Sequence, residues 1–571
     1  MGRSNARGSA ARARPTPAAR AVRSALRAGT AFGLGTLAAG GAHAQAQGST
    51  TAPTQSVAAP SQGGEIAPTD QRAPVSLITG VRAGVTLSDN LNLGPSGSER
   101  AGFVTEVTPY ALYTARSDRL SGRGFVAVRN FVRSEGDAVS LGRLELDGAF
   151  TARLYDDWLW VDATGRIANV AGSPIGPQSF DPVVYGVNTA TFRSYSVSPY
   201  VRSRTPFFDY ELRYRHTNSN VAGSSLGTGL NSASASATTG NRLGRWVLGY
   251  FGDITRVRLG DGRTLDRQVA VASAGYAVSS ELQVGATVNY EQIDFLRNDN
   301  GRDNGYGYGT FVNWRPNSRT SVAATYSHRY YGDTGSAAIN WRTRRTTWNV
   351  TYARSVLSSV DASLLLFDPT GLGSTVPGQP GFNPIASRLF QQNLLLFGAQ
   401  PLDVTLLSNA LVLDKRLVAT GGLTGLHNSL LATIYYNTRE SAGEFSQTVS
   451  TGAAGGGPRG SGAAGGGTVA NAFTGRLQQH GLTVGYQHRL DAATTANVTV
   501  RRNYTEVEGI LAGFGPGGDT TLTQLLVGLN TRLTVDTTAG FGLRRTTQRR
   551  NGNFGADYTE NAVIGTLDMR F

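Results

Sequence analysis

The chain has 571 residues and a mass of 60.2 kDa, with 73 glycines, 40% hydrophobic residues and no cysteine. The absence of thiols excludes disulfide bonds, thiolate metal sites, a cysteine nucleophile and a lipid-modified cysteine anchor. The formal net charge is +14, but seven arginines within the first 27 residues supply half of that excess. The other arginines alternate with acidic residues instead of forming basic blocks, so a nucleic-acid partner is not expected.

The N-terminal segment has the layout of a secretory signal. Residues 1–28 are basic, Thr30–Ala39 is small and apolar, and Ala42–Ala46 offers a small-x-small cleavage site. We therefore predict a Sec signal peptide over residues 1–46. The apolar run is too short for a helix that crosses about 30 Å of hydrocarbon, which disfavours a membrane anchor. Residues 47–73 are rich in Ser, Thr, Gln, Gly and Pro and are predicted to be a disordered periplasmic lead-in.

From residue 74 onward the sequence alternates in runs of about ten residues, the length of a tilted strand that crosses a bilayer. The clearest run is Phe207–Thr217, and a second is Arg319–Tyr330. Because side chains alternate across a strand, one face carries aromatic and aliphatic residues for lipid and the other carries charges for water. The predicted lipid face of the first run consists of Phe208, Tyr210, Leu212, Tyr214 and His216. The predicted lumen charges are Asp209, Glu211, Arg213, Arg215 and Arg329.

Alternation alone also fits a secreted soluble all-β protein, but the spacing of the turns favours a membrane barrel. Short periplasmic turns and long outer loops are typical of outer-membrane barrels. The predicted short turns are Asp156-Asp157, Arg204-Thr205-Pro206, Ser279-Ser280, Arg315-Pro316-Asn317 and Asp491–Thr494, and the predicted long loops are Arg297–Asn304 and Glu440–Asn471.

The tryptophans support the same interpretation. All six lie within a few residues of a predicted short turn, which predicts one ring of indoles at the periplasmic headgroup level. They are Trp158, Trp160, Trp246, Trp314, Trp341 and Trp348.

The C-terminus provides a third feature. Leu567, Met569 and Phe571 alternate along the last predicted strand and end on a terminal phenylalanine. This pattern resembles the terminal signal by which the outer-membrane assembly machinery recognises its clients.

Together these features predict an all-β fold, a transmembrane antiparallel outer-membrane β-barrel of roughly 18–22 strands formed by residues 74–571, with both ends in the periplasm. Alternation stops in residues 358–411, where two apolar pieces predict a partly helical insertion. Two interpretations of the insertion stay open, a plug in the lumen or an outer loop. Residues 440–471 form a glycine-rich loop in this prediction.

Two segments carry a resemblance to a known family. Thr79–Leu93, followed by Val104–Pro109, resembles the opening of the outer-membrane β-barrel family associated with the PEP-CTERM and exosortase system. Val412–Leu417, ahead of a predicted strand at Ser429–Thr438, is similar to that family's middle section. The resemblance implies a role near extracellular-polysaccharide export or surface-protein sorting. It transfers no catalytic residue.

Nothing in the sequence predicts catalysis, a metal or a cofactor. The six histidines are dispersed, and no Ser, His and acid set is recognisable. The leading hypothesis is a porin-like or export channel, with a non-conducting structural or tethering barrel as the alternative and an outer-membrane hydrolase as the least favoured. The expected partners are outer-membrane lipids, the assembly machinery and exopolysaccharide or its export proteins. The sequence does not specify an oligomeric state.

Overall fold

The computed structural model describes residues 75–571 except 118, 135–138, 157, 172–176, 178–188, 223–226, 261, 295–302, 358–411, 442–472, 512–514 and 552–556. The predicted signal peptide, the lead-in, the insertion at 358–411 and nearly all of the glycine-rich loop therefore lie outside the described residues. Within them, the sole helix is the single 3₁₀ turn η1 (Gly240–Arg242). No helix in the described part of the chain is long and apolar enough to cross a membrane.

The described residues form 22 strands, and the predicted all-β antiparallel barrel is confirmed, with a strand number at the upper end of the predicted range. The first eleven are β1 (Val75–Ser88), β2 (Gly102–Arg116), β3 (Leu120–Arg133), β4 (Val139–Tyr155), β5 (Leu159–Ala171), β6 (Thr189–Arg204), β7 (Asp209–Val221), β8 (Gly227–Thr238), β9 (Trp246–Leu259), β10 (Thr264–Ala277) and β11 (Leu282–Ile293). The others are β12 (Asn304–Asn317), β13 (Thr320–Arg329), β14 (Gly332–Arg342), β15 (Thr346–Leu357), β16 (Val412–Thr424), β17 (Asn428–Ser441), β18 (Phe473–Arg489), β19 (Thr494–Leu511), β20 (Gly515–Arg532), β21 (Thr537–Asn551) and β22 (Tyr558–Arg570).

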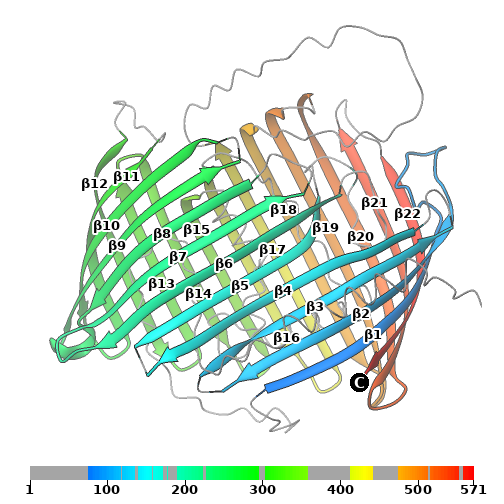
Figure 1. The fold of residues 1–571 in the computed structure, drawn as a ribbon, viewed down its shortest axis with the longest axis horizontal. Coiled ribbons are helices and arrows are strands. Elements are labelled where there is room, and N and C mark those ends of the chain that lie inside the picture. The colour runs from blue at the N-terminus through cyan, green and yellow to red at the C-terminus, as the bar shows by residue number, and fades with distance from the viewer. Residues whose placement is uncertain are drawn as a thin grey trace, which may run out of the picture.

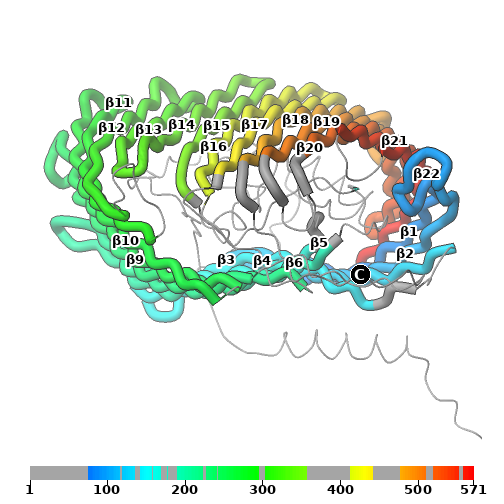
Figure 2. Tube along the Cα trace, turned by 90° about the horizontal axis from the view of Figure 1, so that it is seen from above, coloured from blue at the N-terminus to red at the C-terminus, as the bar shows by residue number. Residues whose placement is uncertain are grey.

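Each strand pairs with the next in an antiparallel register, and the sheet closes because β22 pairs with β1. The closing register runs from Gly80 opposite Arg570 to Ser88 opposite Ala562. The backbone N–H of Phe571 adds one more hydrogen bond, to the carbonyl of Thr79 at 2.8 Å. The strands cross the wall at a steep tilt (Figure 1), and the closed ring is oval when seen from above (Figure 2).

The longest connections all lie at one end of the barrel. The connections that follow even-numbered strands are short, as at residues 318–319 and 425–427, whereas those that follow odd-numbered strands include 358–411 and 442–472. The C-terminus lies at the short-turn end (Figure 1). By the rule for outer-membrane barrels, the short-turn end is the periplasmic end.

Local chemistry explains the short turn between β18 and β19 and the shifted position of another. Asp491 accepts hydrogen bonds from the backbone N–H groups of Ala493 and Thr494, both at 2.6 Å, which lowers the pKa of this turn carboxyl. The prediction of a turn at Arg315-Pro316-Asn317 is wrong by two residues. These residues belong to the end of β12, where the register shifts after Trp314, because proline cannot donate to the ladder and is tolerated at such an irregularity.

The two faces of the wall differ as the alternation predicts. On β7, Leu212 and Tyr214 are 52% and 47% exposed on the outer face, while Thr217 and Ser219 are buried on the inner face. On β12, the outward Tyr306 alternates with the inward Gly307 in the same way. An apolar outer face on a closed antiparallel barrel is the arrangement that hydrocarbon requires.

The absence of native cysteine permits a direct test of the orientation. We expect Ser96→Cys, in the connection between β1 and β2, to react with a membrane-impermeant maleimide in intact cells. Leu426→Cys, which is 91% exposed in a short turn, should react only after the outer membrane is permeabilised. Ile434→Cys, on the outer face of β17, is the control that lipid should shield in both conditions. Labelling of Leu426→Cys in intact cells would reverse the assigned orientation.

Candidate functional site

The candidate functional site is the inner wall of the barrel, where alternate residues of each strand point toward the interior. Glu211, Arg213 and Arg215 lie on the inner face of β7, as the sequence predicts for lumen charges. Asp209 lies at the periplasmic rim of the same face, where Arg242 contacts it at 2.7 Å. The structure therefore brings these four residues together on one strand, close to the short-turn end.

Arg213 is held between two carboxylates. Its Nη1 atom lies 2.5 Å from Oδ2 of Asp162, and its Nε atom lies 2.8 Å from Oε1 of Glu211. The hydroxyl of Thr151 donates to the same Asp162 at 2.7 Å. Arg215 donates to the hydroxyl of Ser198 at 3.3 Å. The positive charge of Arg213 is thus balanced within the wall instead of being presented to the lumen.

Trp160 corrects one prediction, because it is not part of the outer ring. It is 5% exposed and lies on the inner face of β5, two residues before the inward Asp162. Its ring stacks on Tyr200 with centroids 6.2 Å apart, and the guanidinium of Arg202 lies 4.7 Å from its centroid. The guanidinium of Arg213 lies 3.9 Å from the ring centre of Tyr200. Cation–π contacts are stronger where water is excluded, so they stabilise the Trp160 indole away from the membrane interface.

Arg329 occupies a second buried network, on the β10 to β14 wall. Its Nη1 atom lies 2.5 Å from Oε2 of Glu291, and its Nε atom donates to Thr334 at 2.9 Å. Arg267 approaches the other oxygen of Glu291 at 3.8 Å. Arg329 is therefore on the inner wall as predicted, with its charge shared by neighbouring strands.

The closing seam between β22 and β1 carries a third network. Asp568 lies 3.7 Å from Arg82 and accepts a hydrogen bond from the hydroxyl of Tyr110 on β2 at 2.8 Å. The Tyr110 ring reaches across β1 because Gly80 has no side chain, and a Cβ there would lie 2.5 Å from Cζ of the ring. Glu560 on β22 binds Arg544 at 2.7 Å from the other side.

Two further groups of inward charges also pair across strands. Arg129 lies 3.4 Å from Glu106 and 2.8 Å from Glu145, so one cation serves three strands. Arg439 on β17 lies 2.9 Å from Asp414 on β16, with both side chains about 95% buried. The inward charges described so far bridge strands that are adjacent or next but one, so they stabilise the wall as well as making its inner surface polar.

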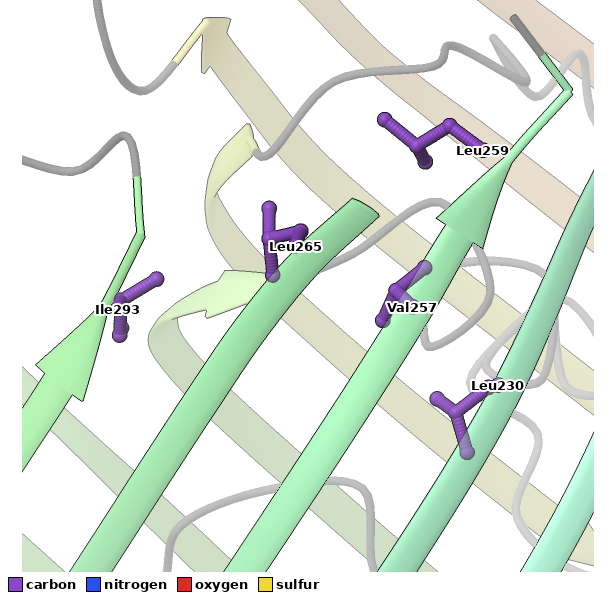
Figure 3. Close-up of a cluster of buried hydrophobic side chains, with 5 residues drawn as sticks. All are labelled: Leu230, Val257, Leu259, Leu265 and Ile293. Carbon is purple, nitrogen blue, oxygen red and sulfur yellow. The ribbon is translucent and has the colours of Figure 1, made fainter. Parts of the chain in front are cut away.

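Near the outer end, parts of the inner wall become apolar, which the sequence reasoning missed. Leu230, Val257, Leu259, Leu265 and Ile293 form a buried cluster on β8 to β11 (Figure 3). Leu265 shares the inner face of β10 with Arg267, and Ile293 shares that of β11 with Glu291. The sequence could have predicted this cluster, because Leu265 and Ile293 each lie two residues from an inward charge and therefore on the same face of the strand.

The connection between β1 and β2 covers another part of the inner wall. Leu91 packs against Val104 and Phe131, and Leu93 packs against Leu522 and Tyr558. Leu93 holds a φ of +50°, a strained backbone for a residue with a side chain, so packing must maintain it.

Asn90 anchors this connection. Its side-chain amide donates to the carbonyl of Gly94 at 2.8 Å and to that of Thr559 at 3.0 Å. We call residues 89–101 the first outer loop. It is folded inward and fixed at several points.

The other predicted sites lie on the outer face or at the seam. Five tryptophans lie near the short-turn end and are between 43% and 53% exposed: Trp158, Trp246, Trp314, Trp341 and Trp348. His216 and His328 lie on the outer face beside Tyr195 and Tyr308, with ring centroids 6.0 and 5.4 Å apart. Leu567 and Met569 lie on the closing strand opposite Ala83 and Val81, and Phe571 is 76% exposed beyond it.

Solved structures of outer-membrane barrels align with this chain. The siderophore receptor PirA from Acinetobacter baumannii has a TM-score of 0.44 at 8% identity, over 86% of this chain and 80% of that one. The iron transporter FrpB from Neisseria meningitidis gives 0.43 at 7%, over 86% and 82%. OccK2 (OpdF) from Pseudomonas aeruginosa gives 0.30 at 10%, over 87% and 98%. Likenesses this distant say nothing of the function of this chain. No family model and no curated protein matches it.

The buried pair Asp414–Arg439 provides a test of the inner wall. We expect Asp414→Asn to lower the free energy of unfolding by about 3–5 kcal/mol, because it leaves a buried arginine without its anion. Replacing both residues, as Asp414→Asn with Arg439→Met, should cost less than Asp414→Asn alone. Urea unfolding from lipid vesicles, followed by tryptophan fluorescence, measures the difference.

The same two strands offer a matched control on the opposite face. Lys415 and Glu440 lie 3.2 Å apart at the outer rim, near the start of β16 and the end of β17, and are each 34% exposed. Glu440→Gln should change stability by less than about 1 kcal/mol, as for other solvated pairs. An Asp414→Asn effect no larger than that of Glu440→Gln would show that the inward pair does not stabilise the wall.

Proposed function

We propose that the chain is an outer-membrane passage barrel for a hydrophilic solute. The observation that carries the proposal is the division of the wall, apolar on the outside and largely polar on the inside of a closed ring of 22 strands. A ring of this size encloses more volume than its own inward side chains can fill. Such barrels hold either a water-filled lumen or a plug.

The charge balance of the inner wall bears on the class of cargo. Arg82, Arg129, Arg213, Arg439 and Arg544 each have a carboxylate within 4 Å. A wall whose charges are paired has a weaker field than one with free charges, so it favours an uncharged polar cargo over a strongly anionic one. A neutral glycan has this chemistry. The resemblance in residues 79–93 and 412–417 favours the same class, extracellular polysaccharide.

A second candidate is a non-conducting structural barrel of the envelope, and the first outer loop favours it. Leu91 and Leu93 pack onto the inner wall and reduce the opening at the outer end. Passage through this barrel would require the first outer loop to move. We therefore expect the purified protein to open rarely by itself.

Conductance in planar bilayers separates the two candidates. We expect Leu91→Ser with Leu93→Ser to raise the open probability at least tenfold, because the loop loses the apolar contacts that hold it inward. Leu426→Ser, in an exposed periplasmic turn, is the matched control and should behave like the unaltered protein. Silence of the unaltered protein, of the double variant and of a chain lacking residues 358–411 would overturn passage and leave the structural role.

A deletion strain identifies the cargo. Under the proposal, loss of the gene product should reduce polysaccharide in the culture medium and leave precursors inside the envelope. The unaltered chain, supplied from a plasmid, should restore export. Normal export in the deletion strain would remove polysaccharide as the cargo while leaving conductance unaffected.

A further inference from the structure

The outer face of the barrel has a depression on strands β9 to β13, near the short-turn end. Its volume is about 680 Å³. Its floor is made of small residues, Ala274, Ala286, Thr310 and Ala324, together with the backbone of Gly285. We call it the outer groove. It lies on the face that hydrocarbon covers, so the usual filler of a surface hollow, water, is not available there.

Cross-strand pairing explains why the groove exists. Ala274 lies opposite Ala286, Ala286 lies opposite Thr310, and Thr310 lies opposite Tyr326. Three small side chains in a row leave a channel across neighbouring strands, and the Tyr326 ring ends it. Trp246 and Tyr276 form the other wall, in an edge-to-face pair with centroids 5.1 Å apart. A flexible apolar chain restores the dispersion contacts that a void on this surface would lose.

The rim of the groove at the periplasmic end is cationic. Arg245 is fully exposed in the turn between β8 and β9, and its Nη1 atom donates to the Tyr276 hydroxyl at 3.4 Å. Among the ion pairs of the described residues, none involves Arg245. It therefore stands at headgroup depth, beside an aromatic wall of the groove, with its charge available to a phosphate.

The turns around Arg245 increase this charge. The exposed arginines on the turns and strand ends of this wall are Arg242, Arg245, Arg315, Arg319, Arg342, Arg344 and Arg345. The two acids are Asp209, which Arg242 neutralises at 2.7 Å, and Glu281, whose carboxylate accepts from Ser279 and Ser280 at 2.8 Å.

The opposite wall is balanced. Its periplasmic turns place Asp491 and Asp536 beside Arg489 and Arg532. These two turns carry as many acids as arginines, whereas arginines outnumber acids on the turns beside the groove.

We propose that the outer groove is a binding site for one anionic phospholipid of the periplasmic leaflet. An acyl chain lies across Ala274, Ala286 and Thr310, and the phosphate lies against Arg245. The groove is apolar and faces hydrocarbon, which indicates a lipid. Its rim is cationic, which indicates that the lipid is anionic. Each arginine near a membrane surface contributes about 1 kcal/mol toward an anionic lipid, which is about a fivefold preference.

Trp246 reports directly on the occupant of the groove. In the reporter variant, Trp158, Trp314, Trp341 and Trp348 become Phe, so that Trp246 is the only tryptophan left on the outer face. The full mature chain is reconstituted into phosphatidylcholine vesicles that contain a minor fraction of brominated phosphatidylglycerol or of brominated phosphatidylcholine. We expect the brominated phosphatidylglycerol to quench Trp246 as strongly as an about fivefold larger fraction of brominated phosphatidylcholine would.

Three controls complete the design. Arg245→Gln should remove most of the preference, whereas Arg489→Gln, on the balanced wall, should keep it. A reporter that retains Trp158 in place of Trp246 should be quenched equally by both lipids. Filling the groove with Ala286→Leu should reduce quenching of Trp246 by the brominated chains of both lipids. Equal quenching of Trp246 by the two lipids would overturn the proposal, and so would a preference that survives Arg245→Gln.

If the reporter variant does not fold, retained lipids can be counted on the unaltered protein by native mass spectrometry. One phosphatidylglycerol should remain bound from an equal mixture with phosphatidylcholine, and Arg245→Gln should release it. No selective retention would equally reject the site. None of these readouts depends on conductance, so the result is independent of the proposed passage function.

Discussion

The structure depends on one constraint: hydrocarbon offers no hydrogen bonds, so every backbone N–H and C=O group within the membrane must be paired inside the protein. A sheet with two free edges cannot meet this condition. The pairing of β22 with β1 removes both edges and therefore meets it. Side chains reinforce this seam from the inside. Tyr110 reaches over Gly80 to Asp568, and Ser88 on β1 donates to Glu560 on β22 at 3.0 Å. The strands farthest apart in sequence are therefore joined by backbone pairing and by polar contacts.

Closure also explains the arrangement of the charges. An arginine on the inner wall that bridges two strands fixes their relative register, since a shift of one residue would turn it toward lipid. Arg129, between Glu106 and Glu145, does this for three consecutive strands, and Arg213, between Asp162 and Glu211, does it for β5 and β7. The same residues give the lumen its polarity. Wall stability and lumen chemistry therefore come from one set of side chains, and a change to either affects the other.

Alternation made the fold readable in the sequence, because a period of two residues assigns each side chain to lipid or lumen. It assigned Arg213, Arg215 and Arg329 to the face on which the structure has them, although Arg213 and Arg329 pair with carboxylates within the wall. Trp160 was misplaced because its distance from a turn was given more weight than its parity with Asp162, which marks the inner face. The outer groove could not be predicted from the sequence for another reason. Ala274, Ala286 and Thr310 become neighbours only through the register of three strands, and no local pattern records a register.

The apolar part of the inner wall bears on how passage would proceed. Water wets a permanently open lumen, so leucines there would be costly to expose, yet Leu91 and Leu93 are buried against the wall. Freeing both costs about 3–6 kcal/mol at about 1.5–3 kcal/mol for each leucine. Such a cost leaves an open population on the order of 1% or less. Strain at Leu93 offsets part of it, because its φ of +50° relaxes once the packing is lost. Under the passage proposal, a barrel of this design would stay closed until a cargo or partner binds the open form more tightly, whereas a general diffusion pore stays open.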